Sequence, residues 1–365
     1  MKKSMGITLA ILLVAVLCLG VVGCSSQTPA ASSAAPASEA APASSAAPAS
    51  ASAAASEAGA AKSSYTFGYI AYNMADIWNE YSEKAFEYAA SKADVPVKVI
   101  ALDSKNNVEE SVKCMESLIQ QGVDGISIFP ISSDQGAQLV KMANDANIPV
   151  TIENYAMDDV KNPGDYIAAV ACRYDDIGYA AMKYMAEQKP GAKVFFCAGQ
   201  KGAGVYEKYQ EGVDKALKEL GDKLVIVDTQ HGDWETEKAM NVTQNFIQTG
   251  KEFDYIFANN GMMAKGCYQA LQEANKTDIP IVSTGGSPDD YSMLESKVEG
   301  ANMTAPVSIQ GVQTFKNLYD TIVLGKAPTD KFQPLPIIPV DTSDLSKFIA
   351  WDNYEAAYDY VYGAK

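Results

Sequence analysis

Residues 97–129, VKVIALDSKNNVEESVKCMESLIQQGVDGISIF, show most plainly how the chain is built. The stretch begins with a short apolar run, Val97–Leu102, and ends with a second one, Gly125–Phe129, and both have the composition of buried strands. Between them, Asn107–Gln121 carries apolar residues at helical spacing along one stripe. A strand, a helix and a second strand in this order predict a parallel βαβ unit with a right-handed crossover.

The same alternation continues along the chain from Tyr65 onward. Further buried strands are predicted at Thr66–Ala71, Pro149–Ile152, Ala192–Cys197, Leu224–Asp228, Tyr255–Ala258 and Ile279–Ser283. Amphipathic segments such as Asp134–Asn147 lie between them, and we expect Met182, Met185 and the pair Met262-Met263 to pack in the core. The pattern predicts an α/β fold with parallel sheets, in which ligands bind beyond the carboxyl ends of the strands.

The first residues of the chain are typical of a secretion signal. Lys2 and Lys3 precede an apolar run from Ile7 to Val22, which is shorter than the roughly 20 residues of a transmembrane helix. The run leads into Cys24 through a pattern that resembles the lipobox of bacterial lipoproteins. We therefore expect residues 1–23 to be a lipoprotein signal peptide and Cys24 to carry a lipid; an ordinary signal peptide with a chance cysteine is the alternative.

The segment that follows differs in composition from the rest of the chain. Residues 24–63 consist mostly of Ala, Ser and Pro, which bury too little apolar surface to offset chain entropy, so we expect a disordered tether. Residues 64–365 are long enough for two domains. The formal charge of −16 argues against nucleic acid as a partner and against a basic membrane-binding patch.

The sequence contains no recognisable catalytic or cofactor motif, and we expect neither an enzyme nor a bound cofactor. The one histidine, His231, is expected on a loop before a helix at Trp234. The stretch Gly199–Gly204 lacks the spacing of phosphate and dinucleotide loops, and is interpreted as a tight turn into a helix with weak affinity for anions. The acidic pairs Asp158-Asp159 and Asp289-Asp290 are interpreted as helix caps or solvated turns.

The cysteines beyond the signal region lie apart from one another in apolar stretches. None of them has the spacing of metal ligands, so we expect no metal site. We expect all of them to be small buried apolar residues: Cys114, Cys172, Cys197 and Cys267.

Several segments together resemble the ribose- and galactose-type periplasmic sugar-binding proteins in order and spacing. They are Leu102–Asn107, Gln121–Ile126, Val140–Val150, Phe257–Asn260 and Ile281–Asp289. The similarity covers most of residues 65–340. It implies two Rossmann-like α/β lobes with parallel sheets, joined by a three-segment hinge and clamping a ligand between them, as in the type I periplasmic binding proteins.

The resemblance also implies where the chain divides. The hinge segments would fall near Cys172–Asp175, Thr304–Ala305 and Phe332–Pro336. The N-terminal lobe would comprise residues 64–173 plus 306–334, and the C-terminal lobe residues 174–305 plus 335–365. For Trp351 and its Tyr-rich surroundings we expect only a C-terminal helix that packs on a lobe.

A sugar site needs aromatic rings against the apolar faces of the sugar and planar polar groups at its hydroxyl edges. The loop after the first strand contains Tyr72, Asn73, Asp76 and Trp78. By resemblance, Trp78 stacks on the ligand and Asp76 accepts hydrogen bonds from hydroxyl groups. The alternatives are that Asp76 caps a helix and that Trp78 packs in the core.

Three further positions match ligand-contacting residues of the family. Trp234 falls where the family has its second stacking aromatic residue. Asn154 and Asn260 match contacts made by amide side chains, which both donate and accept; turn formation is the alternative for each.

Other positions depart from the family pattern. Where the family has polar contacts to the sugar, this chain has Tyr209, Tyr155, Phe129, Gly285 and Ala305. Two of the replaced residues, at Tyr209 and Tyr155, are arginines in the family. The site has thus lost charge and gained aromatic surface. We therefore also consider a flatter or less hydroxylated ligand, such as a modified sugar, a glycoside or a nucleoside.

These expectations describe a monomeric lipoprotein on the outer face of the cell membrane, most simply a Gram-positive one. It would capture a small molecule, such as a sugar, and deliver it to an ABC-type permease with its ATPase. A sensor that presents its ligand to a membrane receptor is the first alternative, and an extracellular enzyme on the same scaffold is the second. A DNA-binding repressor of related fold is disfavoured, because the lipobox and the tether stand where its headpiece would be.

Overall fold

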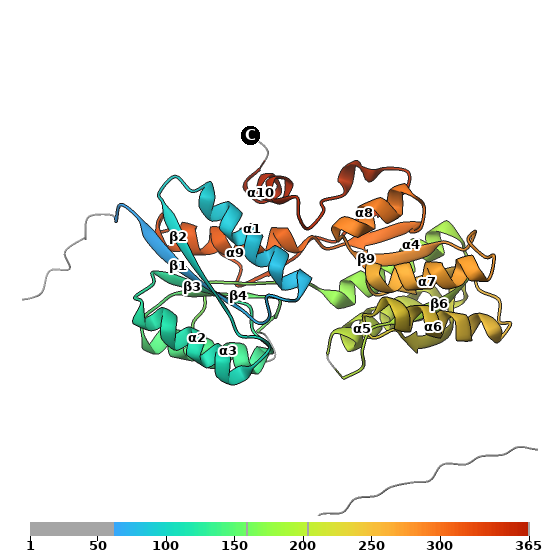
Figure 1. Ribbon diagram of the computed structural model, residues 1–365, viewed down its shortest axis with the longest axis horizontal. Coiled ribbons are helices and arrows are strands. Elements are labelled where there is room, and N and C mark those ends of the chain that lie inside the picture. The colour runs from blue at the N-terminus through green and yellow to red at the C-terminus, as the bar shows by residue number, and fades with distance from the viewer. Residues whose placement is uncertain (1–61, 158–159, 203, 364–365) are drawn as a thin grey trace, which may run out of the picture. The chain divides into compact units, whose positions relative to one another are not determined.

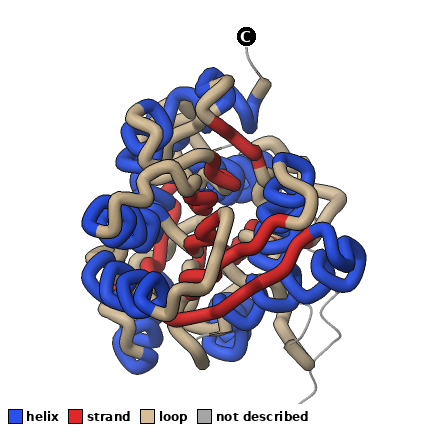
Figure 2. Tube along the Cα trace, turned by 90° about the vertical axis from the view of Figure 1, so that its right-hand side faces the viewer, coloured by secondary structure: helices blue, strands red, loops and turns tan. Residues whose placement is uncertain are grey.

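The computed structural model describes residues 62–157, 160–202 and 204–363. The expected signal peptide, Cys24 and nearly all of the expected tether lie outside this part of the chain, as does the pair Asp158-Asp159. Two six-stranded sheets form the centres of two lobes (Figure 1). In the end-on view of Figure 2 the strands run through the interior, between helices on both sides.

The first sheet is parallel throughout, in the order β11-β5-β4-β3-β1-β2. Its strands are β1 (Tyr65–Ala71), β2 (Val97–Asp103), β3 (Gly125–Ile128), β4 (Val150–Glu153), β5 (Ala169–Ala171) and β11 (Phe332–Pro334). Its helices are α1 (Ile77–Ser91), α2 (Val108–Gln120), α3 (Ser133–Asp145) and α9 (Val307–Ile322). Helices α2 and α3 cover one face of the sheet, and α1 and α9 cover the other.

The second sheet has the order β12-β10-β9-β8-β6-β7, and its edge strand β12 pairs antiparallel with β10. Its strands are β6 (Ala192–Ala198), β7 (Leu224–His231), β8 (Tyr255–Ala258), β9 (Ile281–Gly285), β10 (Ala301–Thr304) and β12 (Ile338–Asp341). Its helices are α4 (Tyr174–Gln188), α5 (Val205–Leu220), α6 (Thr236–Gln248), α7 (Gly261–Glu273) and α8 (Pro288–Glu295). Two short 3-10 turns, η1 (Gly221–Lys223) and η2 (Leu345–Lys347), complete the lobe.

The predicted α/β fold with two lobes is confirmed, and each predicted strand and helix is present with bounds that differ by a few residues. The largest difference is in β7, which continues beside β6 as far as His231. The expectation that His231 lies on a loop is therefore wrong. The helix after it begins at Thr236 rather than at Trp234. The four cysteines expected to be buried are buried and unpaired.

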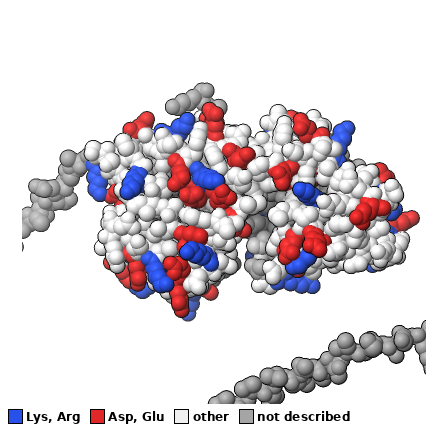
Figure 3. All heavy atoms as spheres, viewed as in Figure 1, with Lys and Arg blue, Asp and Glu red and all other residues white. Residues whose placement is uncertain are grey.

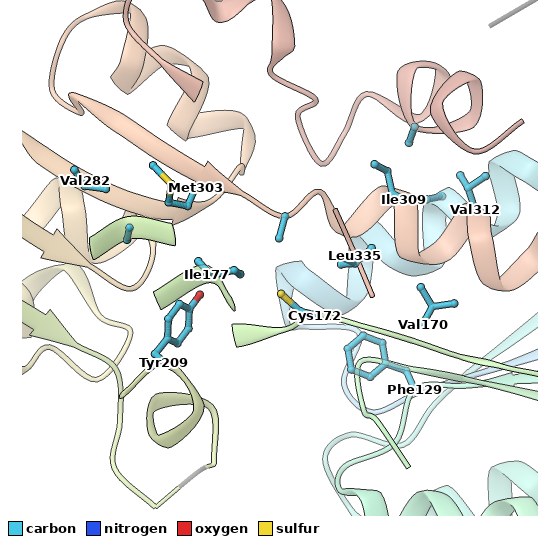
Figure 4. Packing of buried hydrophobic residues seen from close by; sticks show 14 of the residues in the cluster. Phe129, Val170, Cys172, Ile177, Tyr209, Val282, Met303, Ile309, Val312 and Leu335 are labelled. Carbon is cyan, nitrogen blue, oxygen red and sulfur yellow. The ribbon is translucent and has the colours of Figure 1, made fainter. Parts of the chain in front are cut away.

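The chain passes from one lobe to the other after β5, after β10 and after β11. These passages agree with the three hinge segments that the family resemblance implied. Figure 4 shows one continuous apolar cluster around them. Val170 and Leu335 contribute to it from the first lobe's side, and Ile177 and Met303 from the second, so the lobes share buried surface at the hinge.

A further helix, α10 (Tyr354–Tyr362), lies after the second lobe's last strand but packs on the first lobe. It contacts α9 and α1, and the Tyr88 ring lies 6.0 Å from that of Tyr354 and 6.2 Å from that of Tyr358. The expectation that residues 335–365 belong entirely to the second lobe is therefore wrong. It fails because α10 packs its half-buried Tyr354 and Tyr358 rings near Tyr88 of α1 and contacts α9.

A buried carboxylate holds the first lobe together around β4. Glu153 is the last residue of this strand and is fully buried. Its oxygens accept hydrogen bonds from Tyr69, Ser82, Ser127, Gln310 and Thr314, at 2.6–3.3 Å. These donors come from β1, α1, β3 and α9, so a single side chain ties together elements that are far apart in sequence. Full hydrogen bonding is what permits a carboxylate to be buried without a cation.

We predict that Glu153→Gln destabilises the protein by about 2–3 kcal/mol, because an amide would turn two of its hydrogens toward donors that need an acceptor. Chemical denaturation would measure the change in free energy of unfolding. The control is Glu116→Gln, a substitution of the same kind at an exposed position of α2, expected to change stability by less than about 0.5 kcal/mol. Equal effects of the two substitutions would contradict this role of Glu153.

Candidate ligand-binding site

A cavity of about 580 Å³ lies between the two lobes. This is within the usual range for small-molecule sites, roughly 300–1,000 Å³. The residues that line it follow the carboxyl ends of parallel strands in both sheets, as the rule for open α/β sheets predicts. The lining is rich in aromatic rings, which come from Tyr72, Trp78, Phe129, Tyr155, Tyr174, Tyr209, Trp234 and Trp351.

Most of the residues expected at the site from the sequence line this cavity. They are Tyr72, Asp76, Trp78, Phe129, Asn154, Tyr155, Tyr209, Trp234 and Asn260. Asn73 is not among the lining residues: its side-chain oxygen accepts a hydrogen bond from the backbone N–H of Ala75 within its own loop. Contact of these residues with a ligand stays a prediction.

The first lobe's wall is held by a small hydrogen-bond network around Asn154. The Asn154 side-chain oxygen accepts from Trp78 Nε1 and from the Tyr174 hydroxyl, both at 3.2 Å. Asn154 has a left-handed backbone (φ 64°), which asparagine tolerates better than most residues. Asp76 caps α1 by accepting from the backbone N–H of Asn79 at 3.2 Å. The helix-cap alternative for Asp76 is thus confirmed, and the same residue also lines the cavity.

In the second lobe, Tyr209, which was expected where the family has an arginine, is a buried neutral group. Its hydroxyl lies 2.8 Å from the Thr284 hydroxyl, which itself donates to the backbone carbonyl of Asn259 at 2.8 Å. Tyr209 is therefore the donor to Thr284. Burial raises the pKa of Tyr209, so the phenol stays protonated. Asn260 caps α7 through its side-chain oxygen, 2.8 Å from the backbone N of Met263.

Trp234 is held in the cavity wall by an unusual backbone. Asp233 and Trp234 both have left-handed φ values, 51° and 68°, which are rare for a bulky residue. The indole lies directly over Gly199, where an added Cβ would come within 2.1 Å of the ring. Glycine at position 199 is therefore needed for this ring position.

The glycine-rich loop before α5 forms the predicted turn into a helix, but two of its glycine amides are already occupied by a carboxylate of the protein. The Glu207 carboxylate accepts from the backbone N–H groups of Gly202 and Gly204, at 2.7 and 2.9 Å. These hydrogen bonds hold the pKa of Glu207 below its usual value. The expectation of weak anion binding at this loop is therefore wrong, because the protein's own carboxylate fills the place of an anion.

Several lining residues were not expected from the sequence. Met262 was expected in the core, but it is exposed and lines the cavity, while its neighbour Met263 is buried. Adjacent helical residues point about 100° apart, so the pair cannot share one environment. Nothing in the local sequence separates two methionines in this respect. Asp290 was expected in a solvated turn or as a cap; it does cap α8, but it is buried.

Asp290 is one of two buried carboxyl groups that face each other at the edge of the cavity. Its Oδ2 accepts from the backbone N–H of Ser287 and of Gly286, at 2.6 and 3.0 Å. Burial raises the pKa of Asp290 to about 6. Burial and the charge of Asp290 raise the pKa of Glu299 well above its usual value. Both carboxyl groups therefore hold their protons to higher pH than exposed carboxyl groups do.

We predict that this pair makes folding less favourable as the pH rises from about 4 to about 6. The folded protein holds the protons of these two carboxyl groups more tightly than the unfolded chain does, so stability present at low pH is lost as the pH rises through the folded pKa values. The loss is up to about 1.4 kcal/mol per pH unit for each of the two protons. Glu299→Gln keeps a donor to Asp290 but does not titrate. Its free energy of unfolding should fall less than that of the wild type over this range.

Denaturant titrations at several pH values would measure the slope for each variant. Glu295→Gln, an exposed position on α8, is the control and should keep the wild-type slope. Identical slopes for wild type and Glu299→Gln would refute a contribution of the raised pKa of Glu299 to stability.

Trp351 is a further lining residue for which the sequence offered no expectation of a place at the site. It is buried, and its Nε1 donates to the backbone carbonyl of Gly285 at 2.8 Å. Its ring meets the Trp78 ring edge-on, with centroids 5.0 Å apart and planes at 88°. No local pattern separates this tryptophan from one that packs beneath a helix.

The charged residues that line the cavity are both acidic. They are Asp76 and Asp290, and no Lys, Arg or His is among the lining residues in the described part of the chain. Within the same residues, no cluster of His, Cys, Asp and Glu has the arrangement of a metal site, and no helix is long and apolar enough to cross a membrane.

Comparison with known proteins agrees with this architecture. A family model described as a periplasmic binding protein domain matches residues 67–327, which is more than two-thirds of the chain. The chain belongs to the periplasmic binding protein family. One relative is the ribose import binding protein of Escherichia coli K12, 29% identical over 267 residues, which cover 72% of this chain and 88% of that protein. Another is the xylitol-binding protein of Mycolicibacterium smegmatis, 27% identical over 282 residues, covering 76% and 77%.

Solved structures share the fold of this periplasmic binding protein. A solute-binding protein from Bacillus halodurans C-125 with bound myo-inositol superposes with a TM-score of 0.66 at 22% identity, covering 82% of this chain and 100% of that one. One from Actinobacillus succinogenes 130z with bound D-allose gives 0.67 at 22% identity, covering 76% and 98%. The two-lobe fold is thus the one found in these solved proteins.

Proposed function

We propose that this protein captures a neutral, hydroxylated small molecule, a sugar or a polyol, between its lobes and delivers it to an ABC-type importer. The observation that carries the proposal is the cavity itself, in which aromatic rings and amide side chains from both lobes face one space. Aromatic rings suit the apolar faces of a sugar, and amides suit its hydroxyl edges.

The hydrogen bonds within the protein indicate which polar groups remain for a ligand. Asn154 and Asn260 both use their side-chain oxygens within the protein, so each has an NH₂ group to offer. Asp76 caps α1 and its carboxylate also interacts with the Tyr72 hydroxyl, and a carboxylate has further lone pairs that can accept. Hydroxyl groups both donate and accept, so a polyhydroxylated ligand can satisfy donors from opposite lobes and an acceptor at once.

The relatives bind compounds of this class. Their names and titles mention ribose, xylitol, galactofuranose, allose and myo-inositol, all neutral and polyhydroxylated. The charge of the lining points the same way. An anionic sugar would bring its carboxylate into a space with two acidic residues and no basic one.

We predict that neutral sugars bind and that sugar acids do not. The chain has three tryptophans, and all three line the cavity, so intrinsic fluorescence reports the site directly. The matched set is D-galactose, D-galactosamine and D-galacturonate, titrated beside D-ribose, D-allose, xylitol and myo-inositol. We expect D-galacturonate to bind at least about tenfold more weakly than D-galactose. The affinity for D-galactosamine should not be lower than that for D-galactose.

Other outcomes would overturn parts of the proposal. Tightest binding of the acid would contradict the charge argument. Binding of nucleosides or aromatic glycosides alone would replace sugars by the flatter ligand class that the aromatic lining also allows. Absence of binding across the whole panel would reject sugars and polyols as ligands.

We further propose that the protein is anchored by a lipid on Cys24, acts as a monomer outside the cytoplasm, and is not an enzyme. The resemblance of the segment before Cys24 to a lipobox supports the anchor. Membership in a family of binding proteins supports the non-catalytic role. On the face seen in Figure 3, acidic and basic side chains are interspersed over both lobes, with no continuous basic area for nucleic acid.

The anchor is tested by Cys24→Ala in the full chain expressed in a bacterium that processes lipoproteins. We expect the variant to lose its membrane association, because two acyl chains are needed to hold a protein stably on a bilayer. Detergent phase partitioning and membrane fractionation would measure the change. Cys18→Ala, a cysteine of the same apolar segment, is the control and should leave the protein membrane-bound. Unchanged partitioning of the Cys24→Ala variant would contradict the anchor.

A further inference from the structure

The chain passes between the lobes a fourth time, after the three hinge segments. Strand β12 belongs to the second lobe's sheet, whereas α10 packs on α1 and α9 of the first lobe. Residues 342–353 therefore form a C-terminal strap from one lobe to the other (Figure 1). The family match ends at residue 327, so this strap is outside the part of the chain shared with the family model.

The strap is attached to the second lobe at a pair of glycines. The backbone N–H of Trp351 donates to the carbonyl of Gly286 at 3.2 Å, and its indole Nε1 donates to that of Gly285 at 2.8 Å. Both glycines have left-handed φ values, 117° and 92°. A Cβ on Gly285 would lie 3.0 Å from the Trp351 ring. The end of β9 is thus shaped to receive this indole.

The same indole meets the first lobe. Trp351 lies edge-on to Trp78, at 5.0 Å and 88°, and its centroid is 6.1 Å from that of Tyr81. Trp78 and Trp351 both line the cavity, so the two perpendicular indoles form a corner in its wall. A ligand in this corner is contacted on two sides, which restricts the substituents that its ring can carry there.

We propose that Trp351 is a ligand-contacting residue that determines specificity, and that the C-terminal strap is the element that brings it to the site. The inference rests on the proposed function, because it takes the ligand to be a small neutral sugar or polyol. Trp351 would form an additional wall of the site and contacts both lobes. It lies outside the region that the family model matches.

The test compares Trp351→Ala with Phe348→Ala. Phe348 lies on the same strap and packs against Tyr291 of α8, at 5.5 Å, but does not line the cavity. Calorimetric titration with D-ribose, D-allose, xylitol and myo-inositol would measure the affinity of each variant and of the wild type. Thermal unfolding of the same samples would measure the effect of each substitution on stability.

We expect Trp351→Ala to lower the affinity for the tightest-binding of these ligands by about tenfold or more, as loss of a buried tryptophan contact does. It should also change the order of affinity among the four compounds. Trp351→Phe should restore part of the affinity. Phe348→Ala should lower thermal stability but change affinity less than about threefold. Equal losses of affinity in the Trp351→Ala and Phe348→Ala variants, in step with lost stability, would mean that the strap only stabilises the fold and would overturn the proposal.

A second measurement does not depend on removing Trp351. In the double variant Trp78→Phe and Trp234→Phe, Trp351 is the one remaining tryptophan. A ligand whose binding is detected by calorimetry should shift the fluorescence emission of Trp351 and reduce the quenching of that emission by acrylamide. Binding without either change would refute the contact. If none of the four compounds binds the wild type, the proposed sugar or polyol ligand fails, whereas wild-type binding that Trp351→Ala leaves unaltered overturns this inference alone.

Discussion

The parallel pairing of strands is the constraint on which the rest of this structure depends. In a parallel sheet every strand ends at the same edge, so the loops that follow the strands gather there regardless of their separation in sequence. Each lobe has such an edge, and the two edges face one cavity. Residues as distant as Tyr72, Asn154, Trp234 and Asn260 become neighbours for this reason. The antiparallel pair of β10 and β12 lies at the outer edge of its sheet and leaves this arrangement intact.

Both lobes bury carboxyl groups close to the ends of strands, and they solve the electrostatic problem in different ways. Glu153 is surrounded by side-chain donors from four other elements and needs no counter-ion. Asp290 and Glu299 face each other, and burial raises the pKa of both, so protonation takes the place of a cation. In each case the buried group holds a strand end or a helix start that carries cavity residues. The polar core therefore positions the site as well as the fold.

The site is aromatic and acidic where the family resemblance implied arginine contacts. Tyr209 is a buried neutral phenol bonded to Thr284, which removes a positive charge from the second lobe's wall. Trp351 adds a third indole from a segment that also links the lobes. A ligand in this cavity would meet rings, amides and carboxyl groups, and no basic side chain among the lining residues of the described chain. This balance favours neutral ligands over anionic ones.

Periodicity and residue type in the sequence by themselves determined the alternation of strands and helices and the α/β fold with parallel sheets. The resemblance of ordered sequence segments to a known family added the two lobes, the hinge segments and most of the predicted cavity residues. Only the tertiary structure decided that Met262 faces the cavity while Met263 is buried, that Glu207 fills its own glycine loop, and that α10 returns to the first lobe. It alone placed Trp351 at the cavity, because the contacts of that ring with Trp78 and Gly285 join residues more than sixty positions apart, and no local sequence pattern encodes such a contact.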